Sequence, residues 1–170
     1  MKEVPNHTGC PVQPLEKFRP HPMNPILHPP GQINLLANIL EYQGWRNPIV
    51  VSELSGYIVA GHGRLAAAIQ LGLDVAPISS QKFTDEAQEI AHMLADNRIA
   101  ELAIKNLNNL KDLVLHIDTG AFNMDLTGFT EEDLSTLFMP PKEPEPEPQP
   151  KEIKSEETCQ QCCRRVHFLD

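Results

Sequence analysis

The sequence predicts an α+β domain, with a small mixed sheet and packed helices, followed by a disordered linker and a short cysteine-rich tail. Of the 16 prolines, eight fall in residues 1–30 and six in residues 140–150, so residues 31–139 are the compact part. Within that part, stretches with helical spacing of apolar residues alternate with short β-branched runs. The apolar fraction of 41% suffices for a core.

We expect four segments along the chain of 170 residues. Residues 1–11 are a flexible N-terminus, residues 12–139 form the domain, residues 140–157 are a Pro/Glu-rich linker and residues 158–170 are the tail. The linker alternates Pro with Glu, Gln and Lys, so it offers no apolar face from which a core could form.

The first 30 residues indicate an extended arm, because their prolines hold the backbone in β or polyproline geometry. A helix is predicted next. Ile33, Leu36 and Leu40 recur at three- and four-residue steps, and Gly44 suits the C-terminal cap of that helix.

A β-hairpin is predicted after this helix, from a β-branched strand over 48–51, a turn over 52–56 and a second strand over 57–60. Small and apolar residues over 64–71 then predict a helix, and residues 75–79 predict a further strand.

Three more helices are predicted in the second half of the domain. Thr84 can cap the N-terminus of a helix that runs to about Leu102, and apolar spacing over 107–114 indicates another. Residues 130–133, Thr-Glu-Glu-Asp, resemble a capping box before a last helix that includes residues 134–138.

The composition indicates a cytoplasmic protein. No run approaches the roughly 18 apolar residues of a membrane span, and residues 1–10 lack the apolar segment of a secretory signal. The four cysteines, Cys10, Cys159, Cys162 and Cys163, all lie outside the compact part, so no disulfide is expected in the core.

The charge counts against autonomous binding to duplex DNA. The net charge is −9, of which −7 falls in residues 1–139 and −2 in residues 140–170. Neutralising phosphates usually requires a surplus of Lys and Arg. We therefore expect any DNA contact to be indirect or weak.

A strand–turn–helix segment over 57–69 carries the main functional hypothesis. Gly61 and Gly63 let a ligand approach the backbone, and the first N–H groups of the helix have no internal acceptor. Arg64 adds a planar cation suited to phosphate, and His62 can donate, accept or transfer a proton. We expect a bulky side chain at Gly63 to block this approach and to strain a positive φ. An ordinary glycine turn with a surface Arg is the alternative.

Two other segments offer polar groups. Asp96, Asn97 and Arg98 follow one another in an otherwise apolar-periodic helix and could bind phosphate, ribose or Mg²⁺, or could form a solvated face with a local Asp–Arg pair. Asn24 lies between prolines, where a rigid arm that packs across the domain is the alternative to a binding role.

The order of these motifs over about residues 12–137 resembles the ParB-like N-terminal domain of the ParB/sulfiredoxin superfamily, especially the versions found in phages and mobile elements beside DNA methylases. The resemblance implies a nucleotide held between the arm, the glycine turn and the later helix. It implies a phosphate motif at Gly61, His62, Gly63 and Arg64, a second phosphate or metal motif at Asp96, Asn97 and Arg98, and a base or ribose contact near Asn24.

The chain departs from the better-known members of this superfamily. Partition ParB proteins have Glu and Arg at the places of His62 and Gly63, and they continue into a helix-turn-helix domain, for which no room remains after residue 139. Sulfiredoxins have a catalytic Cys where this chain has His62, so sulfinic-acid reduction is excluded. Free-serine kinases carry Gly-His-His-Arg, whose second His is Gly63 here and whose preceding acid is Ala60.

The tail carries a candidate zinc site. Cys159 and Cys162 form a Cys-x-x-Cys pair, which Cys163 or His167 could extend to four ligands. A disordered tail with redox-active thiols and a truncated zinc ribbon are the alternatives.

The sequence therefore predicts a nucleotide-dependent switch or adaptor in phage or plasmid DNA metabolism, serving modification, partition or packaging. It would bind CTP or ATP with magnesium at Gly61–Arg64 and act beside a methylase, terminase or nuclease, with a homodimer as one expected assembly. The alternatives are an enzyme, either a ParB-like DNA nuclease, an NTPase or a free-serine-type kinase, and a degenerate domain that binds only protein. The catalytic candidates are His62 and Asp96.

Overall fold

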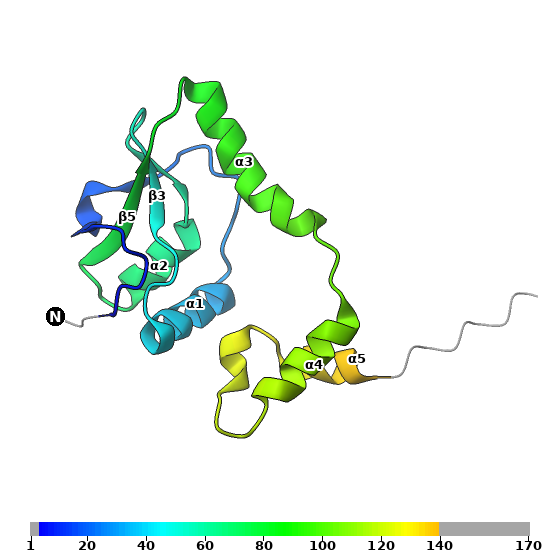
Figure 1. Ribbon diagram of the computed structural model, residues 1–170. Coiled ribbons are helices and arrows are strands. Elements are labelled where there is room, and N and C mark those ends of the chain that lie inside the picture. The colour runs from blue at the N-terminus through cyan, green and yellow to red at the C-terminus, as the bar shows by residue number, and fades with distance from the viewer. Residues whose placement is uncertain (1–3, 140–170) are drawn as a thin grey trace, which may run out of the picture. The chain divides into compact units, whose positions relative to one another are not determined.

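The computed structural model describes residues 4–139 and holds an α+β fold, as predicted (Figure 1). Its five strands are β1 (Val12–Pro14), β2 (Arg19–Pro20), β3 (Ile49–Ser52), β4 (Tyr57–Ala60) and β5 (Val75–Gln81). Its five α-helices are α1 (Pro30–Gln43), α2 (His62–Gln70), α3 (Glu86–Leu102), α4 (Leu107–Ile117) and α5 (Glu131–Phe138). Two short 3₁₀ turns, Leu15–Lys17 and Met124–Thr127, complete the elements of this part of the chain.

The sheet is mixed and has the order β1-β5-β3-β4-β2. β3 and β4 form the predicted antiparallel hairpin, and α2 then carries the chain back so that β5 pairs parallel with β3. The two short strands of the arm close the edges, β1 antiparallel to β5 and β2 parallel to β4. The turn into α2 therefore follows a strand, β4, that is the neighbour of the central strand β3.

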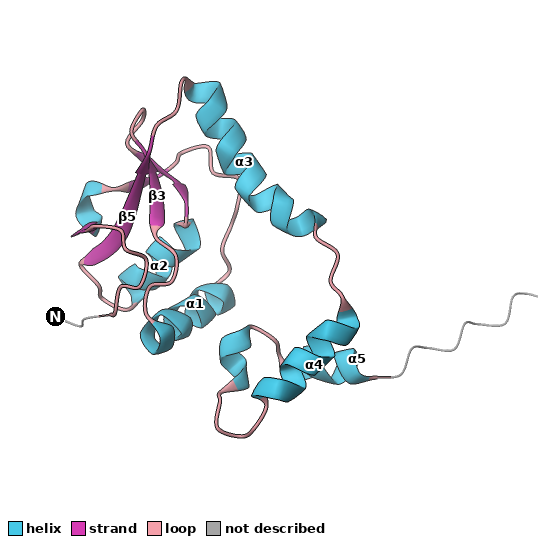
Figure 2. Ribbon diagram, viewed as in Figure 1, coloured by secondary structure: helices cyan, strands magenta, loops and turns pink. Residues whose placement is uncertain are grey.

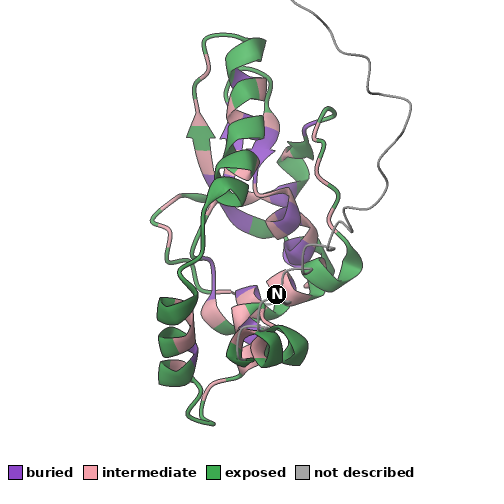
Figure 3. Cartoon of the chain, turned by 90° about the vertical axis from the view of Figure 1, so that its right-hand side faces the viewer, coloured by how far each residue is buried: buried purple, intermediate pink, exposed green. Residues whose placement is uncertain are grey.

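The core lies between the sheet and the two helices α1 and α2, which lie side by side (Figure 2). Ile49, Ile58 and Ile78 are fully buried strand residues, and Ala67 and Ala68 give α2 a small-residue face that lets it approach the sheet closely. Burial is concentrated in these elements, whereas the second half of α3 and most of α4 are exposed (Figure 3).

Several predicted boundaries differ from the structure by a few residues. The helix predicted to begin at Arg64 begins at His62, because a left-handed Gly61 already reverses the chain. Asp85, not Thr84, caps α3, and its carboxylate accepts from the N–H of Gln88 at 2.8 Å. The predicted capping box of α5 is confirmed, since the Asp133 carboxylate and the Thr130 hydroxyl each accept from the other residue's N–H.

The first described residues make backbone contacts with the domain. Trp45 donates its N–H to the Pro5 carbonyl at 2.7 Å, and His7 donates its N–H to the Trp45 carbonyl at 2.9 Å. The proposed domain boundary at residue 12, the linker over 140–157 and the tail over 158–170 stay predictions, and the last two lie outside the described residues.

No helix within residues 4–139 is long and apolar enough to cross a membrane.

Candidate functional site

The turn between β4 and α2 places a helix N-terminus at the surface of a cavity. Gly61 has a φ of +94°, a backbone angle that residues other than glycine rarely adopt, and α2 begins at the next residue. Leu65 donates the first intrahelical hydrogen bond, to the Gly61 carbonyl at 2.9 Å. The N–H groups that precede it have no intrahelical acceptor, so they and the helix dipole favour an anion here.

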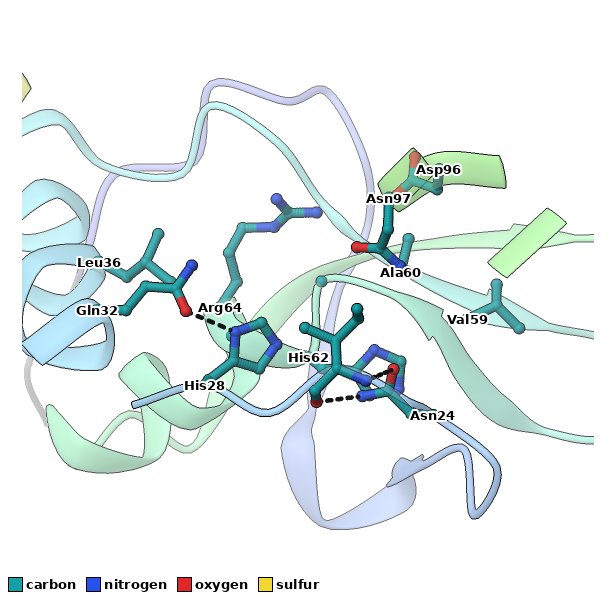
Figure 4. A pocket seen from close by; sticks show the side chains of 13 residues that line it. Asn24, His28, Gln32, Leu36, Val59, Ala60, His62, Arg64, Asp96 and Asn97 are labelled. Atoms are coloured by element: carbon teal, nitrogen blue, oxygen red, sulfur yellow. Dashed lines mark hydrogen bonds between the residues drawn. The ribbon is translucent and has the colours of Figure 1, made fainter. Parts of the chain in front are cut away.

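The cavity at this turn has a volume of about 220 Å³ (Figure 4). The arm, α1, the end of β4, the turn and α3 all contribute to its lining. The described residues that line it are Asn24, Ile26, His28, Gln32, Leu36, Val59, Ala60, Gly61, His62, Gly63, Arg64, Asp96 and Asn97. The structure thus brings together seven of the eight residues that the sequence singled out in the domain.

Arg64 lines the cavity, and its guanidinium has a buried donor without a hydrogen-bond partner among the described residues. It folds back over the turn, where a Cβ at Gly61 would lie 2.9 Å from its Nη2, and Nη2 donates to the Pro48 carbonyl at 3.0 Å. Its Nε is buried and has no hydrogen-bond partner among the described residues. Burial lowers the pKa of the Arg64 guanidinium, and the Asp96 carboxylate counteracts part of this shift. A buried donor of this kind costs about 1–3 kcal/mol until an acceptor reaches it.

Gly63 is needed for close packing and not for its backbone angle. Its φ is not positive, so the expected strain at this residue is wrong, because Gly61 alone makes the turn. A Cβ at Gly63 would lie 2.9 Å from Cδ1 of Leu36 and 3.2 Å from the ring of His28. The absence of a side chain therefore lets the arm and α1 close on the helix N-terminus.

The ring of His62 is held by backbone groups. Its Nε2 accepts from the N–H of His21 at 3.3 Å, and the ring also hydrogen-bonds the backbone of Ile58. Burial lowers the pKa of the His62 imidazole, and the nearby His28 and His21 rings lower it further. Since the arm occupies Nε2, His62 joins the arm to the turn and could transfer a proton only after the arm releases it.

A buried polar cluster, which we call the Glu89 cluster and define as His21, Ser52, Ser55 and Glu89, stands next to this contact. The Glu89 carboxylate accepts from Ser52 Oγ and Ser55 Oγ, each at 2.6 Å, and lies 3.3 Å from His21 Nε2. The side chains of Glu89 and His21 are only 1% and 4% exposed. The cluster ties α3 to the hairpin and to the arm, and so fixes two walls of the cavity relative to each other.

The three polar residues of α3 have different surroundings. Asn97 donates its Nδ2 to the Met93 carbonyl at 2.9 Å, and Asp96 is exposed beside the cavity. Arg98 is not part of the lining. It pairs with Glu101 at 2.7 Å on a surface where the two side chains are 64% and 58% exposed, so it lies on a solvated face as in the alternative, but its partner is a Glu and not an Asp.

On the arm, Asn24 lines the cavity and also holds a local turn. Its side chain accepts from the Ile26 N–H and donates to the Ile26 carbonyl, both at 3.2 Å (Figure 4). His28 and Gln32, joined by a 3.0 Å hydrogen bond between Nδ1 and Oε1, also line the cavity, and neither was among the predicted site residues. The proline spacing around His28 predicted only an extended arm and gave no signal for them.

Of the predicted metal ligands, those for zinc lie in the tail and those for magnesium lie on α3. Cys159, Cys162, Cys163 and His167 lie outside the described residues, so zinc binding by the tail stays a prediction. Between residues 4 and 139, no group of three or more His, Cys, Asp or Glu side chains is arranged to hold a metal ion. Asp96 is the one carboxylate among the described lining residues, and its neighbour Asn97 keeps Oδ1 available.

Comparison with known proteins gives the following relatives. No family model matches the chain. The ParB-like nuclease domain-containing protein YnaK of Escherichia coli (strain K12) is 36% identical over 78 residues, which cover 45% of this chain and 88% of the relative. One similar solved structure is the C-terminally truncated chromosome-partitioning protein ParB from Caulobacter crescentus, complexed with CTP-gamma-S. Its TM-score is 0.51 at 24% identity, and the match covers 76% of this chain and 70% of the ParB chain. Sulfiredoxin from Arabidopsis thaliana has a TM-score of 0.41 at 29% identity, over 49% of this chain and 93% of that one.

Proposed function

Because the chain belongs to the ParB-like nuclease-domain family of the ParB/sulfiredoxin superfamily, we propose that its Gly61–Arg64 turn binds a nucleoside triphosphate, CTP or ATP, with magnesium. The observation that carries the proposal is the buried Nε of Arg64, which has no partner within residues 4–139 although it lies beside a cavity at a helix N-terminus. A phosphate oxygen is the kind of acceptor that this donor lacks.

The residues of the cavity fit such a ligand. Backbone N–H groups at the start of α2 can bind phosphate oxygens, because Gly61 and Gly63 keep side chains away from them. Mg²⁺ is usually held by one or two carboxylates together with phosphates, and Asp96 with the Oδ1 of Asn97 would serve this role. Asn24, on the arm, would face the ribose or the base.

The contacts favour a binding role over catalysis by His62. A general base needs a free nitrogen, and Nε2 of His62 already accepts from the arm. Asp96 is the candidate for activating a nucleophile, because it is exposed at the cavity. We therefore favour a nucleotide-dependent switch or adaptor in phage or plasmid DNA metabolism, with a methylase, terminase or nuclease as its partner and slow or no hydrolysis.

Isothermal titration with CTP, ATP, GTP and UTP, with and without Mg²⁺, tests the proposal. The ParB structure with the same fold is described in complex with CTP-gamma-S, which makes CTP the first nucleotide to test. We expect saturable one-to-one binding of at least one triphosphate, strengthened by Mg²⁺. Absence of binding of all four at millimolar concentration would leave the protein-binding alternative.

DNA cleavage is a second candidate, supported by the description of the E. coli relative as a protein with a ParB-like nuclease domain. Asp96 would then hold the metal that activates water. Incubation with supercoiled plasmid and Mg²⁺ should give nicked product that Asp96→Asn removes and Asp112→Asn, a change on α4, leaves in place. Equal products from wild type and Asp96→Asn would point to a contaminating nuclease.

A further inference from the structure

A second cavity, of about 190 Å³, lies next to the first, between the C-terminal half of α1 and the loop before β3. The two cavities share Leu36 and Arg64 in their linings. The second one adds Arg46 and Asn47 from the loop and Gln43 from α1. Nothing in the proposed binding of a nucleotide at the turn uses these three residues.

Arg64 lines both cavities. Its side chain starts in the first turn of α2 and folds over Gly61, and its Nη2 reaches the Pro48 carbonyl. That carbonyl belongs to the residue after Asn47. A ligand that reaches Arg64 from the first cavity therefore lies beside a residue that also lines the second.

Arg46 makes the second cavity cationic. It is exposed, and no hydrogen bond or ion pair to it occurs in the part of the chain that the structure describes. No carboxylate is among the described residues that line this cavity. Two arginines thus line one small space in a protein whose net charge is −9.

The C-terminus of α1 repels an anion in the second cavity, but this repulsion is weaker than the attraction by the two arginines. A helix C-terminus carries the equivalent of about half a negative charge. Arg46 and Arg64 carry a full positive charge each, and the leucines of α1 keep solvent from one wall, which strengthens their attraction for an anion. The amides of Gln43 and Asn47 can donate to the same ligand.

We propose that this second cavity is a subsite for the terminal phosphate of the triphosphate bound at the turn, with Arg46 and Arg64 as its two cations. The inference rests on the proposed function, because it needs the inner phosphates at Gly61–Arg64. It makes Arg46 the residue by which the protein distinguishes a nucleoside triphosphate from the corresponding diphosphate.

Titration with matched nucleotides tests the subsite. For each nucleotide that the wild type binds in the presence of Mg²⁺, we compare the triphosphate with its diphosphate in wild type, Arg46→Ala and Lys82→Ala. Lys82 is an exposed cation outside both linings, so it controls for net charge. Melting temperatures of the three proteins show that each is folded.

We expect the wild type to prefer the triphosphate. Arg46→Ala should weaken triphosphate binding about tenfold or more, the usual effect of losing a hydrogen bond to a charged group. Diphosphate binding should change less than about twofold, and Lys82→Ala should bind both ligands as the wild type does.

Two results would overturn the subsite while leaving the proposed function intact. Unchanged triphosphate binding by Arg46→Ala would exclude Arg46 from the site. Equal losses for triphosphate and diphosphate would place the nucleoside, and not the terminal phosphate, in the second cavity. A wild type that binds no nucleotide at all would instead overturn the proposed function, and the subsite with it.

Discussion

The Glu89 cluster and Arg64 are two polar sites withdrawn from solvent, and they differ in how completely their hydrogen bonds are made. Both carboxylate oxygens of Glu89 have partners, from Ser52, Ser55 and His21. Arg64 makes one hydrogen bond, to Pro48, and its Nε has none within the described part of the chain.

The difference separates a structural role from a ligand-binding one. A satisfied buried network stabilises the native arrangement, and removing one partner leaves the other groups unpaired. An unsatisfied buried donor weakens the free protein and becomes favourable only when a ligand supplies the acceptor. Variants of the two sites should therefore have opposite effects on stability and on binding.

The largest effect is expected for Glu89→Ala. Removing this carboxylate leaves His21 and two serine hydroxyls without their shared acceptor, so the free energy of unfolding should fall by about 3–5 kcal/mol. Urea unfolding followed by circular dichroism measures it. The control is Glu86→Ala, an exposed change in the first turn of the same helix, which should cost at most about 1 kcal/mol. Equal stability of the two variants would show that the cluster contributes nothing.

Arg64→Met should show the opposite pattern. The Met side chain keeps the apolar stem packed but removes the charge, so nucleoside-triphosphate binding should weaken by about 1.5–3 kcal/mol. The free energy of unfolding should stay within about 1 kcal/mol of the wild type, since one hydrogen bond is lost and one buried, unpartnered donor is removed. A variant that loses stability and binds nucleotide normally would reverse the assignment of the two sites.

The smallest effect on stability is expected at His62, whose ring joins the turn before Arg64 to His21 of the Glu89 cluster. The lowered pKa means that the unfolded chain binds a proton more readily than the folded one below the ordinary value of 6.5. The contribution of this residue to stability is therefore fully present above pH 6.5 and is lost as the pH falls toward the lowered pKa. Urea midpoints at pH 7.5 and pH 5.5 should differ less in His62→Gln than in wild type, and an identical difference would contradict this.

The sequence predicted the turn well because its signals are local. Glycines, the start of a helix and an adjacent Arg lie within four residues, and the structure keeps that order in space. In the Glu89 cluster, Glu89 lies 34 positions from Ser55 and 37 from Ser52, and His21 is farther away still, so no local pattern contains the cluster.

One feature of the sequence could have indicated that Glu89 is buried. Glu89 precedes Met93 and Asn97 at four-residue steps, on the face of α3 that turns toward the sheet, where a carboxylate is unexpected unless it has buried partners. Arg98 lies outside the lining for the converse reason. One step further around the helix, the side chain lies on the exposed face and pairs with Glu101.

The most direct test of the binding site is the NMR signal of the Arg64 Nε–H during titration of ¹⁵N-labelled protein with CTP, ATP, GTP and UTP. We predict that this signal and the backbone amides of His62, Gly63 and Arg64 move first and furthest with the triphosphate that binds, because an acceptor reaches a donor that had none. Arg64→Met assigns the side-chain signal by its absence. Binding that shifts signals elsewhere, while the Arg64 Nε–H and the three amides stay in place, would contradict a nucleotide site at this turn.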